Sequence, residues 1–514
     1  MKLIIFAVLL QYSLSLKILQ IVPGFTNSHV LFNYRLAETL TKLGHNVRMW
    51  TQMEMNMVIA GDLSIPKNVT EHRVPIHFSD KMKAEGLSIF QTMMFNKGSA
   101  YDLWWTGQEF KDMRIESCHQ MLKVDPEITN YFKNENFDLA IGHFHDLCPL
   151  AISEKVGIKK VVWITHGTSV YDFTSVQIGL RTFPSFVPHP LGSSGDEMDF
   201  FGRFLNVAWH LSTLDFVNLP QNLLYDENNM YKKEYRPSHD APDLWELSQN
   251  VRILFVNGDR FLDFPRPLPL GITFMGEVGK KSSRSELVFP NEINEIINRA
   301  EKGIIIFSLG TVSNTTNMPP QMLRSFVEAF GKFPEYQILW RMEMEVPEVD
   351  KYSNINLLKW LPQKDLMKHP KTKLLIAHGG YNSFLEAAQS GIPIVLMPLF
   401  ADQFINAKRA KRFGISEELD KLNLTPEIVE EKMKILLNDE KYSKNAKKLA
   451  SMLNDRPFEN PHEILRHRLR LAVAARDHFA LKAAQKLNFF SFYGIDILTS
   501  SLTIFSLLIN IIKN

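Results

Sequence analysis

The stretch WLPQKDLMKHPKTKLLIAHGGYNSFLEAAQSGIPIVLMPLFADQ, residues 360–403, contains a complete strand, loop, helix and strand pattern. The apolar run LLIA at 374–377 predicts a buried strand, and the HGG sequence at 378–380 predicts a turn where backbone can approach a ligand closely. Residues 383–390 predict a helix whose N-terminus points at that turn. Its free N–H groups and the positive end of its dipole would hold an anion there.

The strand that follows brings two more polar residues to the same place. Gly391 ends the helix, and IPIVLMP at 392–398 predicts the next buried strand. This strand leads to Asp402 and Gln403 at the carboxyl edge of the sheet, which is where open α/β sheets bind ligands. Residues from three consecutive loops therefore converge, and the stretch predicts a nucleotide-binding site.

The same alternation of strand and helix runs through the rest of the chain. At 514 residues the chain is too long for a single core, so at least two domains are expected. Periodicity predicts strands at 17–22, 46–50, 303–308, 336–340 and 355–359 and helices at 30–43 and 320–333. The sequence therefore predicts an α/β fold with two Rossmann-like domains facing across a cleft, at 16–280 and 281–485, with a polar linker at 280–285.

The N-terminus has the three parts of a secretory signal peptide, which would cover residues 1–15. Lys2 is the charged residue, 3–10 is the apolar run, and the SLS sequence at 13–15 is a cleavage site with small residues. The alternative is a first buried strand. Residues 17–22 already supply that strand, so the signal peptide is the favoured interpretation.

The C-terminus carries a second apolar segment at 489–512, long enough to cross the ~30 Å hydrocarbon layer of a bilayer as a helix. Asp496 lies near its start, and if the helix proper begins at Ile497 the aromatic residues before it would form an interfacial belt. Signal peptide and anchor together predict a single-pass type I protein of the endoplasmic reticulum membrane with lumenal domains. N-glycans would then be allowed at Asn68, Asn314 and Asn423.

Composition disfavours other classes of function. The formal net charge is +2, with 58 Lys and Arg against 56 Asp and Glu, so the chain lacks the basic excess of a nucleic-acid-binding protein. No G-x-G-x-x-G sequence follows an early strand, which disfavours a dinucleotide-dependent oxidoreductase. Cys118 and Cys148 are the only cysteines, and either one disulfide joins them or both are buried free thiols.

Residues 360–403 resemble the signature of the UDP-glycosyltransferases, and most closely that of the UDP-glucuronosyltransferase branch. The resemblance rests on WLPQ at 360–363, HPKT at 369–372, HGG with Asn382, and PLFADQ at 398–403. It covers nearly the whole chain, including the residues just before the C-terminal anchor. It implies a glycosyltransferase fold of the GT-B type, with the acceptor bound by the N-terminal domain and UDP-sugar by the C-terminal domain.

The resemblance assigns a role to each donor-binding residue. Trp360 would stack on uracil, Gln363 would pair with it, and Glu386 would accept hydrogen bonds from the ribose hydroxyls. Asp402 and Gln403 would hold sugar hydroxyls. The diphosphate would lie among Ser308, Gly310, His378, Gly379, Gly380, Asn382 and Ser383. Because no Asp-x-Asp pair occurs in the sequence, we expect a mechanism that uses no metal ion or other cofactor.

A histidine stands where the family has its general base. The resemblance assigns His29 to take a proton from the acceptor hydroxyl, which suits the ordinary pKa of imidazole. In the family an acidic residue directly follows the strand at 137–142, but His143 stands there and Asp146 comes three residues later. Either Asp146 reaches His29 through a shift of the loop, or His29 works without a carboxylate, or the base is weakened.

These residues predict an inverting transfer of a hexose or glucuronic acid from UDP-sugar to a hydroxyl, or a similar nucleophile, of a small lipophilic acceptor, as in detoxification or the conjugation of lipids and hormones. Some glucuronate-using members carry an arginine where this chain has Val256, which favours a neutral sugar. The alternative is a catalytically weakened UDP-sugar-binding partner subunit, because the orienting carboxylate is displaced. Homo-oligomers and hetero-oligomers both fit the sequence.

Overall fold

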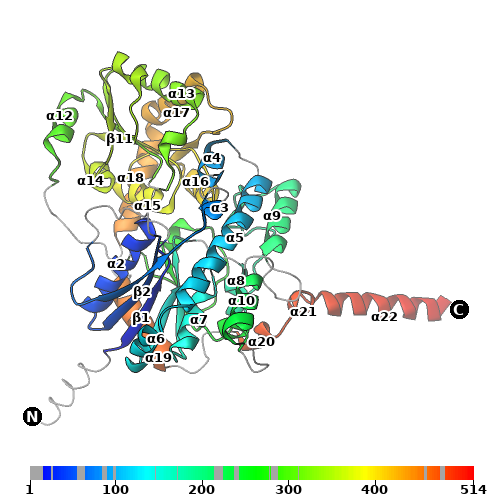
Figure 1. Cartoon of the computed structure of the whole chain (residues 1–514). Helices are drawn as coiled ribbons and strands as arrows, with labels where there is room; N and C mark the ends of the chain where they lie inside the picture. The colour runs from blue at the N-terminus through cyan, green and yellow to red at the C-terminus, as the bar shows by residue number, and fades with distance from the viewer. Residues whose placement is uncertain are drawn as a thin grey trace, which may run out of the picture.

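The computed structural model describes residues 15–24, 27–54, 64–83, 89–96, 100–144, 146–168, 170, 172–213, 224–236, 242–276, 278, 287–310, 312–455, 460–474 and 481–513. The chain forms two α/β domains, one above the other in Figure 1, and a helix that projects from the lower one. Each domain contains one parallel sheet, which confirms the predicted pair of Rossmann-like domains. The predicted signal peptide, apart from Ser15, and the predicted linker at 280–285 lie outside the described residues.

The N-terminal sheet has seven strands in the order β3-β2-β1-β4-β5-β6-β7. They are β1 Lys17–Val22, β2 Asn46–Glu54, β3 Thr70–Ile76, β4 Leu139–His143, β5 Val161–His166, β6 Leu254–Asn257 and β7 Ile272–Phe274. Alternate residues of β1 belong to different cores. Leu19 and Ile21 pack beneath α5 (Ala100–Leu122) and α7 (Cys148–Lys155), whereas Ile18 and Val22 pack against α2 (Asn27–Lys42) on the other face. Burial on both faces explains why β1 is an almost continuous apolar run.

The C-terminal sheet has six strands in the order β10-β9-β8-β11-β12-β13. They are β8 Gly303–Ser308, β9 Tyr336–Arg341, β10 Ile355–Leu358, β11 Thr372–Ala377, β12 Ile394–Leu396 and β13 Ser416–Glu418. In both sheets the strand order reverses beside the first strand, between β1 and β4 and between β8 and β11. Such a switch point opens a crevice at the carboxyl edge, where open α/β sheets bind ligands.

The other helices cover these sheets. In the N-terminal part of the chain they are α3 Asp80–Met82, α4 Ile89–Asn96, α6 Pro126–Asn134, α8 Asp172–Gln177, α9 Phe200–Thr213, α10 Tyr225–Tyr235, α11 Leu244–Ser248 and the 3-10 turn η2 Arg260–Leu262. Of these, α4 packs on the other domain, because Met94 and Phe95 are buried in the C-terminal core. In the C-terminal domain they are α12 Asn291–Arg299, η3 Thr315–Asn317, α13 Pro320–Gly331, η4 Pro347–Lys351, α14 Gln363–Lys368, α15 Tyr381–Ser390, α16 Gln403–Arg412, α17 Pro426–Asn438 and α18 Glu440–Asn454.

The chain then returns to the N-terminal domain. Leu465 and Leu469 of α19 (Pro461–Ala474) lie in the same hydrophobic cluster as β1 and α2. Just before α20 (Lys482–Gln485), the backbone N–H of Leu481 donates to the carbonyl of Ile178 at 2.8 Å. Leu481 lies outside both helices, so α19 and α20 do not form one continuous helix.

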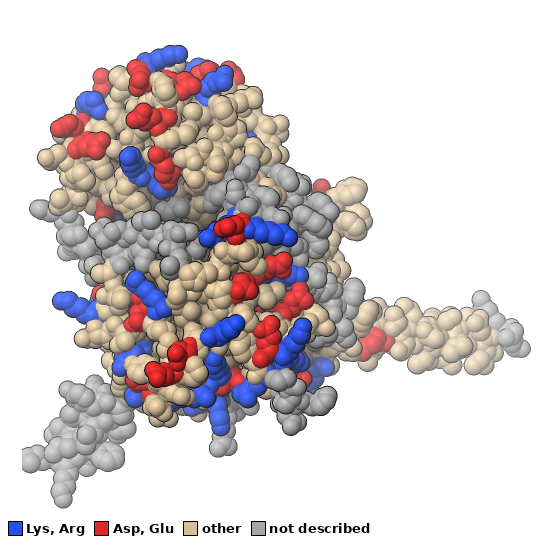
Figure 2. All heavy atoms as spheres, viewed as in Figure 1, with Lys and Arg blue, Asp and Glu red and all other residues tan. Residues whose placement is uncertain are grey.

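The apolar C-terminal segment forms two helices, α21 (Phe489–Phe492) and α22 (Ile495–Lys513). Gly494 separates them with a φ of 67°, a left-handed conformation that favours glycine, so the long helix begins at Ile495 and not at the predicted Phe489 or Ile497. Residues Ile495–Ile512 are long and apolar enough to cross a membrane, and the rest of the chain buries none of this helix. Figure 2 shows α22 as a projecting rod whose acidic colour is confined to its base, where Asp496 lies.

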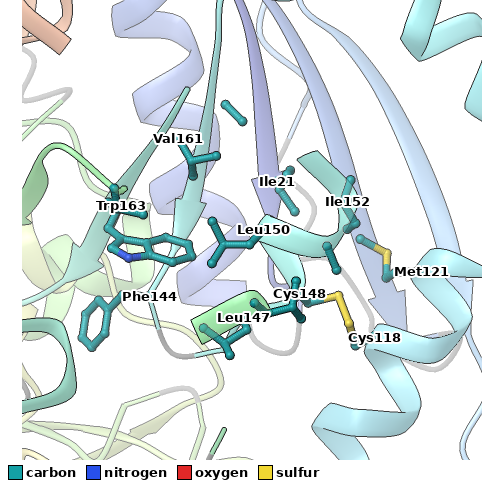
Figure 3. Close-up of a cluster of buried hydrophobic side chains, with 14 of the residues drawn as sticks. Ile21, Cys118, Met121, Phe144, Leu147, Cys148, Leu150, Ile152, Val161 and Trp163 are labelled. Atoms are coloured by element: carbon teal, nitrogen blue, oxygen red, sulfur yellow. A yellow bond between two sulfur atoms is a disulfide. The ribbon is translucent and has the colours of Figure 1, made fainter. Parts of the chain in front are cut away.

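A disulfide joins Cys118 of α5 to Cys148 at the start of α7, with their Cα atoms 5.6 Å apart. Of the two alternatives left open by the sequence, the structure contains the bridge. The disulfide lies at the edge of the cluster in Figure 3, where Leu150 and Ile152 of α7 pack over the sheet. It therefore fixes α7 to α5 directly beside the loop that follows β4.

We predict that the Cys118→Ala/Cys148→Ala variant unfolds more easily than the wild type. The bridge spans 30 residues of sequence, and losing a cross-link over a loop of that size lowers the free energy of unfolding by about 3–4 kcal/mol. Urea unfolding followed by tryptophan fluorescence would measure the change in midpoint. Reductant should lower the wild-type midpoint toward that of the variant and leave the variant unaffected. A wild-type midpoint equal to that of the variant in oxidising buffer would contradict this role.

Candidate functional site

The carboxyl edges of the two sheets face each other across Tyr381, the first residue of α15. Its hydroxyl accepts a hydrogen bond from the backbone N–H of Asp259, which follows β6, at 2.8 Å. A Cβ added to Gly258 would lie 2.8 Å from the Tyr381 hydroxyl, and one added to Gly167 would lie 3.4 Å from the Tyr381 Cβ. The start of α15 is therefore packed against the loops that follow β5 and β6 of the other domain.

The HGG turn joins β11 to α15 and has room only for glycine. Gly379 has a φ of 87°, and a Cβ there would lie 2.9 Å from the carbonyl oxygen of Gln403. A Cβ on Gly380 would lie 2.7 Å from Nε2 of His378. Gly380 is also the residue before the first turn of α15, which receives no hydrogen bond from a capping side chain. Unobstructed backbone N–H groups at a helix N-terminus form an anion site.

The imidazole of His378 packs against the loop after β8. A Cβ on Gly310 would lie 2.6 Å from its Cε1 atom, and Gly310 itself has a φ of 78°. Burial, together with the positive charge of Arg341, lowers the pKa of His378 to about 4, so the ring is neutral at physiological pH. Its Nδ1 atom is buried and has no hydrogen-bond partner in the part of the chain that the structure describes.

Arg341 lies at the end of β9 on the same side of the site. Its guanidinium donates to the carbonyl oxygen of Gly310 and to the carboxylate of Glu343. Ser308, the last residue of β8, is buried, and its hydroxyl oxygen accepts from the N–H of Gly310 at 3.4 Å. The sequence offered no signal for Arg341, because an arginine at the end of an apolar strand is usually a solvated one.

The residues expected to bind the nucleoside lie around one glutamine. The side-chain amide of Gln363 donates to the hydroxyl of Ser383 at 3.1 Å and to the carboxylate of Glu386 at 3.3 Å. Trp360, just beyond β10, leaves 59% of its surface exposed. An indole so exposed has a free face on which an aromatic ring can stack. Asn382 is exposed on the first turn of α15.

Asp402 and Gln403 lie at the start of α16, and both side chains already make hydrogen bonds within the protein. The side-chain carbonyl of Gln403 accepts from the backbone N–H of Leu399 at 2.8 Å and of Phe400 at 3.1 Å, which leaves only its amide group for a ligand. Burial raises the pKa of Asp402, and the amide of Asn406 donates to its carboxylate at 3.0 Å.

Asn406 links this acid to the phosphate loop and to the other domain. Its amide also donates to the carbonyl of Gly379 at 2.9 Å, and its own carbonyl accepts from Arg409 at 2.7 Å. Arg409 donates to Asp263, beyond η2, through Nε at 3.1 Å and a terminal nitrogen at 2.7 Å, and both side chains are only 4% exposed. Asp263 in turn accepts from Arg266 at 2.6 Å. Sequence reasoning missed this series of hydrogen bonds, because Arg409 and Asp263 are 146 positions apart in the sequence.

On the opposing edge, His29 lies in the first turn of α2, after β1. It is partly buried, and burial lowers its pKa to about 4, so it is neutral at physiological pH and able to accept a proton. His143, the last residue of β4, is buried, and its ring centroid lies 6.1 Å from that of His29. The Nε2 atom of His143 lies 3.0 Å from the amide nitrogen of Asn33, which also donates to the backbone carbonyl of His29.

The described contacts of Asp146 lie with α5, α7 and α10. Its carboxylate accepts from the backbone N–H of Cys148 at 3.1 Å, and its charge interacts with Arg114 and Glu227. The expectation that Asp146 orients His29 through a shift of the loop is therefore not met by the described contacts. The reason is local, since the carboxylate accepts from the first N–H of α7 and interacts with the charge of Arg114 on α5. The residue beside His29 is His143.

Val256 also needs correction. The resemblance implies that an arginine at this position would contact the sugar, but residue 256 lies in β6 between β5 and β7 and is fully buried in the N-terminal core. A side chain at this point of the strand faces the hydrophobic cluster and not the cleft. The identity of residue 256 therefore says nothing about which sugar is used.

Comparison with known proteins agrees with this geometry. A family model described as UDP-glucoronosyl and UDP-glucosyl transferase matches residues 17–514. The chain belongs to this UDP-glycosyltransferase family. It is 58% identical over 498 residues to ugt-60 of Caenorhabditis elegans, which is named for the UDP-glucuronosyltransferases, with 97% of each chain covered. It is 28% identical to UDP-glucuronosyltransferase 3A2 of Homo sapiens, over 84% of this chain and 80% of that one.

Solved structures share the fold at low sequence identity. The glycotransferase of kitacinnamycin superimposes with a TM-score of 0.59 at 15% identity, covering 90% of this chain and 100% of its own. The calicheamicin glycosyltransferase CalG4 gives a TM-score of 0.57 at 14% identity, over 90% of this chain and 99% of its own. These likenesses confirm the GT-B fold, and family membership confirms that the chain is a UDP-glycosyltransferase.

We predict that Arg409 and Asp263 are energetically coupled and position the donor loop. Arg409→Met and Asp263→Asn should each lower the free energy of unfolding by about 3 kcal/mol, because each leaves an unpaired buried polar group or charge. The double variant should lose less than the sum of the two. All three should bind UDP more weakly, since Asn406 loses the support of Arg409. Chemical denaturation and calorimetric titration with UDP would measure both effects, and additive losses with unchanged UDP affinity would contradict the coupling.

Proposed function

We propose that the enzyme transfers a sugar from UDP-sugar to a hydroxyl of a small lipophilic acceptor by a single displacement with inversion at the anomeric carbon. The observation that carries the proposal is the opposition of two switch points. The neutral imidazole of His29 lies at the switch point of one sheet, and the glycine loop of His378 lies at that of the other. A base on one side and an anion site on the other suit attack by a hydroxyl as a diphosphate departs.

The donor residues divide the nucleotide-sugar among them. Uracil stacks on the exposed face of Trp360, while the amide of Gln363 hydrogen-bonds to its edge. Glu386 accepts from the ribose hydroxyls, and its present contact with Gln363 holds it in place. Asp402, supported by Asn406, holds a hydroxyl of the transferred sugar.

The leaving diphosphate is stabilised by the protein alone in this proposal. The N-terminus of α15, the guanidinium of Arg341 and the imidazole of His378 surround the loop where negative charge develops. Because the ring of His378 is neutral, it contributes a hydrogen bond rather than a charge.

We predict that the rate of transfer measured in EDTA equals the rate measured with magnesium, because the protein alone stabilises the leaving group. A requirement for a divalent cation would overturn the metal-independent mechanism.

The weakly basic state of His29 suggests what kind of acceptor is used. A carboxylate beside an imidazole raises its pKa and stabilises the imidazolium that forms during proton transfer, and His143 provides no such charge. A phenolic hydroxyl, with an ordinary pKa near 10, needs less help to lose its proton than an alkyl alcohol. We therefore expect phenolic acceptors to be favoured.

We predict that His29→Ala abolishes transfer but leaves binding of UDP-sugar intact. Loss of a general base lowers turnover by roughly 10²–10⁴-fold, and the donor site lies on the other domain. UDP release with mixed phenolic and alcohol acceptors would measure the rate, and calorimetry with UDP would measure binding. His72→Ala, a partly buried histidine on β3, is the matched control and should keep wild-type activity. Normal turnover by His29→Ala would end the proposal.

We predict that His143→Asp raises the pKa of His29 and shifts the pH profile. The pKa of His29 is lowered to about 4, so the imidazole stays unprotonated above that pH. In the wild type the acidic limb of the kcat/KM profile should therefore lie near pH 4. A carboxylate at residue 143 would favour the imidazolium, so the limb should move upward by at least one pH unit. His143→Asn should leave it in place. An acidic limb that is the same in both variants would show that residue 143 does not control His29.

The second candidate function is a UDP-sugar-binding partner subunit with little activity. His143 stands where the family has an acidic residue, and this replacement favours it. A wild-type chain that binds UDP but releases none from any donor and acceptor pair would support this candidate. Turnover that depends on His29 would exclude it.

The location proposed for the enzyme is the lumenal face of the endoplasmic reticulum membrane, with α22 as its anchor. The length and hydropathy of α22 and the disulfide, which suits an oxidising compartment, both support this. Asn68 and Asn423 are exposed and would carry glycans. Asn314 is also exposed, but its side-chain oxygen caps η3. Resistance of the protein to carbonate extraction, and a mass shift with endoglycosidase that Asn68→Gln and Asn423→Gln remove, would test this location.

A further inference from the structure

Helix α9 is amphipathic in the opposite sense to an ordinary surface helix. Its polar residues Asn206 and His210 are buried, at 2% and 5% exposure, and lie one turn apart on the inner face. Its outer face is apolar, and it consists of Phe200, Phe201, Phe204, Leu205 and Val207, of which Phe201 is 73% exposed. A helix that turns apolar side chains outward marks an interaction site rather than a surface in contact with water.

The inner face holds α9 firmly to the segment before it. The amide of Asn206 donates to the carbonyls of Pro184 at 2.6 Å and Val187 at 2.9 Å, and its oxygen accepts from the N–H of His189 at 2.8 Å. His210 Nε2 lies 3.1 Å from the carbonyl of Val187. The exposed apolar face is therefore fixed in orientation by buried hydrogen bonds.

The same segment is attached to the base of the C-terminal helix. The hydroxyl of Tyr493, in the turn between α21 and α22, donates to the carbonyl of Thr182. The ring of Phe183 lies 6.3 Å from that of Tyr493, and the guanidinium of Arg181 lies 5.6 Å from the ring of Phe489. Residues 181–187 therefore connect α9 to the point where α22 leaves the domain.

Figure 1 shows how these elements are placed. α9 lies on the side of the molecule from which α21 and α22 leave, and its axis runs across that of α22. If α22 crosses a bilayer, the side of the domain that carries α9 faces the membrane and α9 runs along the membrane plane. The exposed Phe490 and Phe186 lie on the same connection between the two helices.

We propose that the apolar face of α9 docks on the lipid bilayer beside the anchor, so that the N-terminal domain rests on the membrane surface. The inference rests on the proposed anchoring by α22. Aromatic residues are the side chains that prefer the interface. Arg203, exposed between Phe201 and Phe204, donates to the carbonyl of Met198 in the structure and would extend to the phosphates at a membrane. A second copy of the chain is the competing occupant, but the continuity of this face with the base of α22 favours lipid.

The experiment places a fluorescent label at single cysteines in the full chain. The two native cysteines are joined in a disulfide and do not react, so an introduced cysteine is labelled alone. Phe201→Cys reports on α9, and Phe505→Cys reports on α22. Val288→Cys is the matched control, because Val288 is an apolar residue that is 85% exposed in the other domain. Each protein is labelled with nitrobenzoxadiazole and reconstituted in phosphatidylcholine vesicles.

Two quenchers distinguish the occupants. We expect nitroxide-labelled phosphatidylcholine to quench positions 201 and 505, and aqueous iodide to quench only position 288. Quenching of position 201 by iodide to the same extent as position 288 would overturn the proposal, and so would shielding from both quenchers, which would indicate a second copy. Iodide quenching at position 505 would instead overturn the anchoring on which the proposal rests.

A substitution tests the cause without removing the anchor. Phe201→Ser/Phe204→Ser should abolish lipid quenching of a label at Leu205→Cys while position 505 stays in lipid. The melting temperature should be unchanged, because both side chains are exposed in the folded protein. Leu270→Ser, a change of an exposed apolar residue that lies outside α9, should have no effect on the label. Lipid quenching at 205 that survives the double substitution would overturn the role of these aromatic residues.

Discussion

The donor site depends on one steric constraint, the contact of the His378 ring with two glycines. The ring occupies the space that a Cβ at Gly310 or Gly380 would need, with approaches of 2.6 Å and 2.7 Å. Because β8 and β11 are neighbours in the sheet, the loops after them begin side by side, and only glycine lets both fold over the same imidazole. This packing sets the direction of the first turn of α15. It also removes water from the ring, which is why the pKa of His378 falls.

The site is connected to the N-terminal domain by buried polar groups as well as by apolar packing, in which Leu262 joins the hydrophobic cluster of α15. Asn406 bonds to the backbone of the glycine turn, Arg409 bonds to Asn406, and Asp263 of the other domain bonds to Arg409. Each polar group is buried and paired, so displacing one domain would expose unpaired charges in the other. The Tyr381 hydroxyl makes a second such link at Asp259. The geometry of the diphosphate loop is thus tied to the position of the acceptor domain.

The sequence predicted this half of the protein well, for physical reasons. Burial on both faces gives each strand of a parallel sheet a continuous apolar run, and the predicted strand at 303–308 matches β8 in full. Gly379 and Gly310, predicted as places of close backbone approach, have positive φ angles. The pair of Asp263 and Arg409 could not be predicted, because the two residues are 146 positions apart and only the docking of two domains brings them together. The expectation that residue 256 would contact the sugar was also wrong for a structural reason. Alignment to a family position does not show which face of a strand a side chain lies on.

In the N-terminal domain the expected pairing of Asp146 with His29 is not found, because the Asp146 carboxylate interacts with other groups. Burial raises the pKa of Asp146 to about 6, against the charge of Arg114, and raises that of Glu227 to about 8, with a further contribution from the negative charge of Asp146. At neutral pH, Asp146 is therefore charged beside Arg114 while Glu227 holds a proton.

Both groups bind protons more tightly in the folded protein than in the unfolded one, so their contribution to stability falls as the pH rises from about 4 to about 8. Turning Asp146 toward His29 would move its charge away from Arg114 and would release the hydrogen bond that it accepts at the start of α7. The electrostatic balance of α5, α7 and α10 thus keeps this carboxylate away from the cleft. Of the three alternatives for His29, these contacts oppose the one in which a shift of the loop brings in Asp146.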